Sequence, residues 1–341
     1  MKTKLKLLSS LFLFFVLSCK FDPVPHSGSN DNRNGTGILY VADSVENSIF
    51  IYDNLNSLNG DITATRTLTG TNTLINNPSA IAVDTTRDYL YVSDTTDQKI
   101  LMFSPASSRD GNVAPTKTFT NLKRAGSFFY DSTNDRLYAS DLTDQAIKVW
   151  DSISTLSSGA GPTRTLELAY QPSSFFVDRG RNLLYVGDPA SASIKVYENA
   201  ATLTTSSSHS TLGPSSILSE TRSFTNDTND FVNINGMAIN TDNNILFISE
   251  SNYKSIEVFN TASNLSGAEE SAHRLIGDAT TLNVNQTQVS FNSNTLYVLK
   301  DESHLLIWNN GNTVEGDVAP TRSLNFSDAS RISAFTFDFT D

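Results

Sequence analysis

Acidic side chains recur in this chain at one place, two residues after a short run of Leu, an aromatic residue and an aliphatic residue. Carboxylates gathered in a ring could bind Ca²⁺, which prefers several oxygen ligands. An Asp at the end of a strand also caps its own turn by accepting backbone N–H groups. One acid per repeat favours capping, so we expect no cofactor, with Ca²⁺ as the alternative. The acids are Asp43, Asp94, Asp141, Asp188 and Glu250, and the sixth run is followed by Lys300.

A second set of Asp and Asn residues follows a different apolar run, of which Ile-Ala-Val-Asp at 81–84 is the clearest copy. The side chains of Asp and Asn bond nearby backbone groups in tight turns. We interpret this set as structural and expect it on the face of the fold opposite to the first set. Its members are Asp84, Asp131, Asp178, Asn240, Asn292 and Asp338.

A third set of polar residues lies four positions ahead of the residue equivalent to Ile81 in these apolar runs, which is Ile, Phe or Met. Unlike the acids, these residues differ from repeat to repeat, as a site for one asymmetric ligand would require. We predict that they bind a small polar or anionic ligand, held by the two arginines, or else are solvated loop residues. They are Asn77, Arg124, Gln171, Asn233 and Arg331.

The residues that an enzyme of this size would need do not form a known pattern. Cys19 is the only cysteine, and the four histidines, His26, His209, His273 and His304, share no metal-ligand spacing. No Gly-x-Ser-x-Gly segment is present. The sequence therefore favours a binding module with no catalytic residue, and a metal-assisted hydrolase or lyase is the alternative.

The elements that must position these residues are short strands. Apolar runs at 81–83, 90–92 and 100–103 are bounded by turn-forming residues, and a more polar run follows a Pro at 116–119. The run at 90–92 recurs six times, with its aromatic residue advancing by 51, 47, 47, 62 and 50 positions. Four strands per repeat predict one propeller blade, so we expect an all-β, six-bladed β-propeller. The longer step comes from a Ser- and Thr-rich segment at 200–219, which we expect to be a surface loop.

The two ends of the chain complement each other. The first repeat begins at Ile38 with its second strand, and the missing first strand stands at the C-terminus as Ala334–Asp338. We therefore expect the C-terminal strand to complete the N-terminal blade and close the ring, which removes free sheet edges. The fourth strands carry Lys or Arg, and we interpret these as protection of the outer edges.

The motif Pro-x-x-Ile-Ala-Val-Asp, Leu-Tyr-Val-x-Asp, Ile-x-x-Phe resembles NHL-repeat and related six-bladed (TolB-like) propellers over about residues 36–341. The resemblance implies that first strands line a central channel. It also implies that the second-to-third and fourth-to-first connections share the functional face. Such propellers host binding proteins, lactonases and lyases alike. The chain lacks the Glu-Gly-Pro-like segment of the lactonase-like members.

The N-terminal residues predict where in the cell the protein is located. Lys2, Lys4 and Lys6 precede an apolar run at 7–17 that is too short to span a bilayer and ends before Cys19. This resembles a bacterial lipoprotein signal, so we predict a signal peptide at 1–18, a lipid attached to Cys19, a flexible tether over 19–36 and a propeller over 37–341. The expected location is the cell envelope, on the outer membrane or facing the periplasm.

The charge of the chain restricts its partners. The formal net charge is −12, and it falls further once the three lysines of 1–18 are removed. A strongly acidic surface disfavours nucleic acid, whose phosphates must be neutralised by Lys and Arg. We expect a protein partner in the envelope or outside the cell, and contact with the membrane through the lipid.

Overall fold

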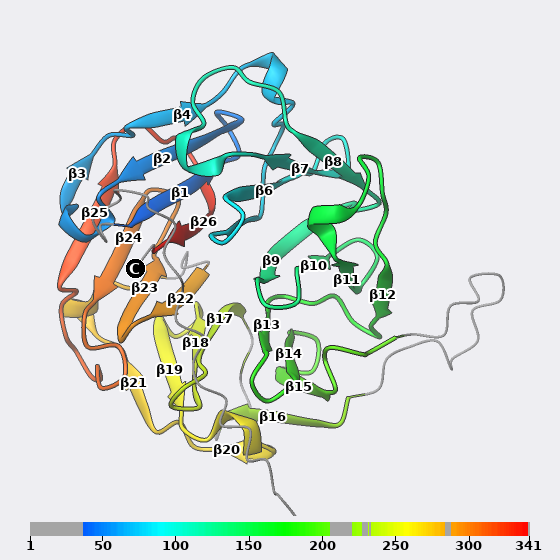
Figure 1. The fold of residues 1–341 in the computed structure, drawn as a ribbon. Coiled ribbons are helices and arrows are strands. Elements are labelled where there is room, and N and C mark those ends of the chain that lie inside the picture. Colours follow the sequence, from blue (N-terminus) through cyan, green and yellow to red (C-terminus); the bar gives the residue numbers. More distant parts are fainter. Residues whose placement is uncertain (1–36, 205–219, 227–230, 232, 284–287, 340–341) are drawn as a thin grey trace, which may run out of the picture.

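The chain folds into a ring of six β-sheets around a central axis (Figure 1), which confirms the predicted six-bladed propeller. The computed structural model describes residues 37–204, 220–226, 231, 233–283 and 288–339. The predicted signal peptide, Cys19, the tether at 19–36 and most of the 200–219 segment lie outside the described residues. Within the described part, no helix is long and apolar enough to cross a membrane.

Each blade consists of four antiparallel strands, ordered from the axis to the rim. Blades 1 to 3 are, in turn, β26 (Ile332–Asp338), β1 (Ile38–Asp43), β2 (Ser48–Asp53) and β4 (Arg66–Leu68); β5 (Ile81–Asp84), β6 (Tyr89–Asp94), β7 (Lys99–Phe103) and β8 (Lys117–Thr120); and β9 (Ala125–Asp131), β10 (Arg136–Asp141), β11 (Ala146–Asp151) and β12 (Arg164–Glu167).

Blades 4 to 6 repeat this order, and two of them gain a short parallel fifth strand from the next blade. They are β13 (Phe175–Asp178), β14 (Leu183–Asp188), β15 (Ser193–Glu198), β16 (Arg222–Asn226) and β20 (Gly267–Glu269); β17 (Ile234–Asn240), β18 (Ile245–Glu250), β19 (Ser255–Phe259) and β21 (His273–Leu275); and β22 (Gln288–Asn292), β23 (Thr295–Leu299), β24 (His304–Trp308), β25 (Arg322–Phe326) and β3 (Gly60–Ile62).

Single 3₁₀ turns punctuate the connections. They are η1 (Leu55–Ser57), η2 (Thr71–Thr73), η3 (Ala106–Ser108), η4 (Ile153–Thr155), η6 (Ala262–Asn264) and η7 (Asp278–Thr280).

The ring is closed by both ends of the chain. β26 pairs with β1 in antiparallel register from Ile38↔Asp338 to Ala42↔Ala334. This confirms the predicted closure: the C-terminal strand supplies the innermost strand of the first blade. Every innermost strand then has a neighbouring blade on each side, and no sheet edge is left free at the ends of the chain.

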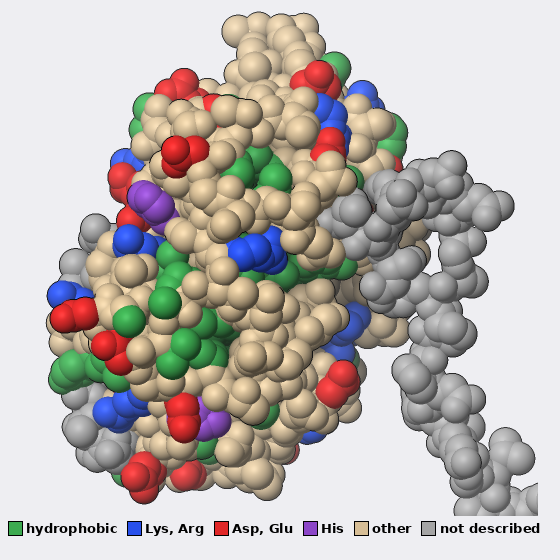
Figure 2. Space-filling model, turned by 90° about the vertical axis from the view of Figure 1, so that its left-hand side faces the viewer, with side chains coloured by type: hydrophobic (Ala, Val, Ile, Leu, Met, Phe, Trp, Pro, Cys, Tyr) green, Lys and Arg blue, Asp and Glu red, His purple; other side chains and the backbone are tan. Residues whose placement is uncertain are grey.

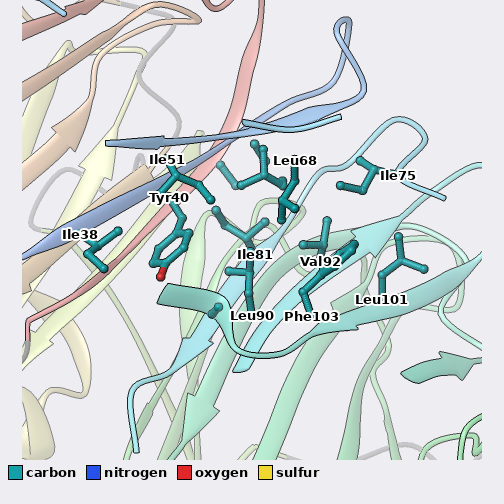
Figure 3. Close-up of a cluster of buried hydrophobic side chains, with 14 residues drawn as sticks. Ile38, Tyr40, Ile51, Leu68, Ile75, Ile81, Leu90, Val92, Leu101 and Phe103 are labelled. Carbon is teal, nitrogen blue, oxygen red and sulfur yellow. The ribbon is translucent and has the colours of Figure 1, made fainter. Parts of the chain in front are cut away.

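The core lies between adjacent blades, because the middle strands present apolar side chains to both neighbouring sheets. Figure 3 shows one such layer, where Tyr40 and Ile51 of blade 1 face Leu90 and Phe103 of blade 2. The aromatic residue at the end of the third strand is buried in the same way, and Trp150 is fully buried. Most of these positions are β-branched or aromatic, which suits a pleated surface that is buried on both sides.

The first strands alternate in length around blades 1 to 5. β26, β9 and β17 have seven residues, and β5 and β13 have four. In the long strands the first residue pairs with the acid that ends the second strand, as in Asp141↔Ala125. Pro78 and Pro172 stand at this position in blades 2 and 4. Because Pro has no backbone N–H and restricts the residue before it, the strand begins three residues later.

The basic residues of the fourth strands bind the next blade, which differs from the expected protection of a free edge. Lys117 Nζ, for example, donates to the carbonyl oxygens of Ser154 at 2.7 Å and Leu156 at 2.9 Å. Where the structure describes them, segments ahead of the fourth strands lie along the rim of the preceding blade, so the chain itself covers those edges. The other pairs are Arg66 with Arg109, Arg164 with Leu203, Arg222 with Ser263 and Leu265, and Arg322 with Leu55 and Leu58.

The side of the rim that Figure 2 shows presents no field of one sign. Figure 2 views the left-hand side of Figure 1, where the outer strands of blades 1, 5 and 6 lie, and its acidic and basic side chains are scattered among one another. Interspersed charges of both signs keep a surface soluble without attracting a polyanion.

Candidate functional site

The candidate site is a cavity of about 280 Å³ on the ring axis, lined by the innermost strands of all six blades. In each blade, one residue of the innermost strand pairs with the aliphatic residue of the Leu-aromatic-aliphatic run in the second strand. These six residues therefore lie at the same height along the ring axis. This tier is apolar throughout: Ile81, Phe128, Phe175, Met237, Val289 and Phe335. The first strands therefore line the channel, as the resemblance implied.

Phe128, Phe129, Phe176 and Phe337 are partly exposed at the cavity wall, whereas Phe175 and Phe335 are almost completely buried between blades. Phe129 of blade 3 meets Phe176 of blade 4 edge to face, with ring centroids 5.0 Å apart. Phe335 and Phe337 of blade 1 lie with centroids 6.1 Å apart. The edge-to-face arrangement of Phe129 and Phe176 is favourable because ring edges carry positive and ring faces negative partial charge.

The wall becomes polar one or two positions ahead of the apolar tier, towards the face that carries Asp43. We name this the Asp43 face. Ser127, Ser174, Asn235 and Ser333 stand there, on four different blades. Two of these side chains hold neighbouring segments of the protein. Ser333 Oγ donates to the carbonyl of Pro78 at 2.6 Å, and the Asn235 amide donates to Ser251 Oγ at 2.9 Å.

Three hydroxyl groups of the lining have no hydrogen-bond partner among the described residues. Ser174 is only 4% exposed, yet its hydroxyl makes no hydrogen bond to the protein. Ser290 and Thr336 face the cavity at one height on the adjacent strands β22 and β26. In the part of the chain that the structure describes, none of these three hydroxyl oxygens is a fully buried atom without a partner, so each is open to the cavity, where water or a ligand can bond to it.

Close packing on one side of the ring makes the cavity asymmetric. A Cβ atom at Gly236 would lie 2.6 Å from the backbone nitrogen of Val289, so only glycine lets β17 approach β22 this closely. On the other side of β22, the Gln288 amide both donates to and accepts from the backbone of Phe335, at 2.9 Å each. The six strands therefore surround the axis unevenly.

The acids of the Asp43 face hold backbone together. Asp43 accepts four N–H groups: one carboxylate oxygen caps the turn at Val45 and Glu46, and the other bonds Ser330 and Arg331 at 2.6 and 2.7 Å. Asp141 likewise bonds Thr143 and Asp144 in its turn and Lys123 ahead of the first strand. Glu250 reaches both Asn233 and Tyr253.

Asp188 and Asp94 bond only within their own turns, and of the two Asp94 leaves an oxygen without a hydrogen bond. One oxygen of Asp94 caps the turn at Asp97, and the other, although buried, has no hydrogen bond. The ammonium of Lys99 lies 3.6 Å away. In this blade Pro78 follows Asn77, whose N–H donates instead to Asn47 of blade 1. Burial therefore raises the pKa of Asp94, and the N–H of Asp97 and the charge of Lys99 offset this only in part.

On the opposite face, four members of the second set cap their own turns, as predicted: Asp84, Asp131, Asp178 and Asn240. Asp84 accepts the N–H groups of Thr86 and Arg87, and its other oxygen accepts the Tyr130 hydroxyl of the next blade at 2.7 Å. Burial, together with the hydrogen bond to Asp84, raises the pKa of Tyr130. The hydroxyl therefore stays protonated and serves as a donor between blades.

A Ser, a His and an Asp meet in one turn of blade 6 without forming a catalytic arrangement. The His304 Nδ1 atom lies 2.9 Å from both Ser303 Oγ and Asp301 Oδ1. A triad needs the serine and the carboxylate on opposite ring nitrogens, so this cluster stabilises the turn. Burial alone would raise the pKa of Asp301, but hydrogen bonds from His304 and Ser303 lower it. The described residues contain no group of three or more His, Cys, Asp or Glu side chains that could hold a metal ion.

The five polar residues predicted to bind a ligand lie on the Asp43 face, outside the cavity lining, and all are exposed. Arg124 and Gln171 come together, since Leu142 donates its N–H to the carbonyl of Arg124 and accepts from the Gln171 amide at 2.9 Å. The Arg331 guanidinium pairs with Glu302 at 2.9 Å. Asn77 and Asn233 bond through their backbone N–H groups to Asn47 and Glu250.

The guanidinium of Arg124 makes no hydrogen bond or ion pair with any residue that the structure describes. Only its backbone is held, by Asp141 and Leu142. Its side chain is therefore available to a partner, whereas that of Arg331 would have to leave Glu302.

The comparisons support the fold and no narrower family. No family model and no curated relative matches the chain. Among solved structures, 1165 chains match, so the fold is too widely shared to select a function. One match is a chain from a crystal structure of a nidogen/laminin complex. It is 12% identical, the match covers 88% of this chain and 97% of that one, and the TM-score is 0.55.

Sequence reasoning located the strands that line the cavity and missed the residues that define its chemistry. Ser174, Ser290 and Thr336 were not singled out. The signal that could have found them is a hydroxyl residue within, or next to, a first-strand run otherwise rich in Phe, Ile and Val. Such residues suit an edge strand, and on the innermost strand of a closed ring they must face the axis or a neighbouring blade.

Proposed function

We propose that the protein is a lipid-anchored module of the bacterial envelope whose propeller binds a partner on the Asp43 face. The observation that supports this best is how the acids of that face are used. Asp43, Asp141 and Glu250 bond the connections between strands, so they stabilise a rigid platform of turns. Rigid scaffolds that present loops on one face commonly serve recognition.

We assign the propeller to the NHL-repeat-like, TolB-like type on its recurring first- and second-strand motifs. The anchor is the lipid on Cys19 after removal of residues 1–18, and 19–36 is the tether. Several acyl chains on one residue suffice for stable anchoring, since each buried methylene contributes about 0.8 kcal/mol. Tethering at the membrane raises the local concentration of the module beside an envelope protein.

The contact residues we propose are the five polar residues outside the cavity, with Arg124 foremost because its guanidinium is free. The partner is a protein with an acidic patch opposite Arg124 and Arg331, where a guanidinium can bond a carboxylate with two parallel hydrogen bonds. Such a surface can act even on an acidic chain, since charges beyond about 10 Å are screened at physiological salt.

The test is affinity capture from a membrane extract with the full chain. The double variant Arg124→Glu and Arg331→Glu should lose the captured partner, and Arg179→Glu, in a turn of the opposite face, should keep it. Equal capture by both variants would refute the assignment of the face. Elemental analysis of the same preparation tests the alternative function, a metal-assisted hydrolase or lyase. Stoichiometric calcium or zinc together with lactone hydrolysis would support that enzyme and refute the binding module.

The anchor has a separate test. Cys19→Ser should move the protein from the detergent phase to the aqueous phase in a phase-partitioning assay. Partitioning that is unchanged by this substitution would place the anchor elsewhere.

A further inference from the structure

We infer that the central cavity binds a small uncharged molecule with a flat apolar body and a hydroxyl or carbonyl edge. The inference adds to the proposed protein-binding face and rests on the proposed function only in treating the propeller as a binding module. It concerns a different part of the molecule, the axis and not the exposed loops.

The charge of the ligand follows from the lining. The described residues around the cavity include no Asp, Glu, Lys, Arg or His. A charge moved from water into such a place loses its hydration and finds no counter-charge, which is strongly unfavourable. A carboxylate, phosphate or amine is therefore excluded, although the surface of the protein is acidic.

The shape of the ligand follows from the rings. Phe129 and Phe176 meet edge to face across two blades, and Phe337, which is partly exposed beside the buried Phe335, adds a ring from blade 1. An aromatic or alicyclic body can lie against these rings and replace water at the apolar tier. About 280 Å³ is at the small end of ligand pockets, which usually measure about 300–1,000 Å³.

The polar edge of the ligand follows from the unpartnered hydroxyls. Ser174 lies one residue nearer to the Asp43 face than the apolar tier, and Ser290 and Thr336 lie one residue beyond it. Hydroxyl groups both donate and accept, so each suits a ligand hydroxyl or carbonyl. One ligand can bond Ser290 and Thr336 together, because they lie at one height on adjacent strands, and a ligand that also bonds Ser174 must lie across the axis. Such a ligand would replace water at hydroxyl groups that are open to the cavity and that make no hydrogen bond to the described residues.

The experiment uses three probes that share one body: naphthalene, 1-naphthol and 1-naphthalenesulfonate. The protein is the full chain with Cys19→Ser, so that no acyl chain competes for the apolar probes. Titration calorimetry should show one site, with 1-naphthol bound more tightly than naphthalene and the sulfonate at least about tenfold more weakly than either.

Two conservative variants and one control locate the site. Ser174→Ala and Thr336→Val each remove a hydroxyl group at nearly constant side-chain shape. At least one of them should lower the affinity for 1-naphthol about fivefold without changing the affinity for naphthalene. The control is Ser266→Ala, in an exposed loop at the outer rim beside β20. It should leave both affinities unchanged, and all three variants should keep the circular-dichroism spectrum.

Several results would overturn the inference: no saturable binding of any probe, a sulfonate bound as tightly as 1-naphthol, or a naphthol preference that survives both hydroxyl substitutions. Capture of a protein partner by the same preparation separates the two proposals. A captured partner without 1-naphthol binding refutes the cavity ligand alone. Binding of 1-naphthol without a partner supports the cavity ligand and refutes the protein-binding face.

Discussion

Replacing Asp43 by Asn should lower stability much more than replacing Asp94 by Asn, although the two residues are equivalent in the repeat. Each side chain is at most 1% exposed. Asp43 accepts two N–H groups on each oxygen, whereas one oxygen of Asp94 has no hydrogen bond. An Asn side chain keeps one acceptor oxygen and turns the other into a donor.

In Asp43→Asn, the N–H groups of Ser330 and Arg331, or those of the turn, lose their acceptor. Hydrogen bonds to a charged group contribute about 1.5–3 kcal/mol each, so we expect the free energy of unfolding to fall by about 3–5 kcal/mol. In Asp94→Asn, the cap at Asp97 is retained and an unpartnered buried charge disappears. The lost attraction to Lys99 is worth at most about 1 kcal/mol, so stability should stay within about 1 kcal/mol or rise.

The raised pKa of Asp94 also predicts how the stability of Asp94→Asn, relative to the wild type, should change with pH. The pKa of Asp94 is raised in the folded state, so the folded protein holds this proton more tightly than the unfolded chain. This carboxyl therefore lowers stability as pH rises from its unfolded pKa through its raised folded pKa. Asp94→Asn removes that loss, so the stability of the variant relative to the wild type should increase with pH over this window.

Urea denaturation followed by circular dichroism, with the m-value checked for constancy, measures these differences. The reasoning is refuted if Asp94→Asn costs more than about 2 kcal/mol at pH 7, or if the two variants lose equal stability. A relative stability of Asp94→Asn that falls as pH rises would refute the pKa argument separately.

Three further substitutions probe the packing of the ring. Deleting residues 333–341 should remove the innermost strand of blade 1 and broaden or abolish the cooperative thermal transition; an unchanged transition in calorimetry would contradict the closure. Arg322→Ala should lower the free energy of unfolding by about 1–3 kcal/mol, because its guanidinium bonds two carbonyls of blade 1, and denaturation of Arg322→Lys, which keeps a donor, should show a smaller loss. Gly236→Ala should cost about 2 kcal/mol or more, since its Cβ would meet the backbone nitrogen of Val289; a stability equal to wild type would show that β17 and β22 can separate freely.

Much of the fold could be predicted because most of each blade is formed by residues that are close together in the sequence. Alternating apolar runs, turn residues and a spacing near 50 residues define each four-stranded unit, and six copies with a displaced first strand predict the closure seen between β1 and β26. The acids could be predicted to cap turns, because this chemistry depends on residues two or three positions away. The second use of Asp43, on Ser330 and Arg331, could not be read from its own neighbourhood.

The candidate site depends on residues that are distant in the chain. Ser174, Ser290 and Thr336 come from strands more than 40 residues apart, and only the closed ring places them around one cavity. The same holds for Arg322, whose guanidinium bonds carbonyls more than 260 residues away. A side chain on an innermost strand can face the axis or a neighbouring blade, and the packing of adjacent blades decides between these directions.

By itself, the sequence determined the number of blades, their strand order and the strand that closes them, since periodicity and turn chemistry act over a few residues. It also determined where Pro78 and Pro172 shorten two first strands. Only the tertiary structure decided the chemistry of the cavity and the difference between Asp43 and Asp94. The reason is physical: burial and hydrogen-bond partners belong to the space between blades, and that space exists only once the ring is closed.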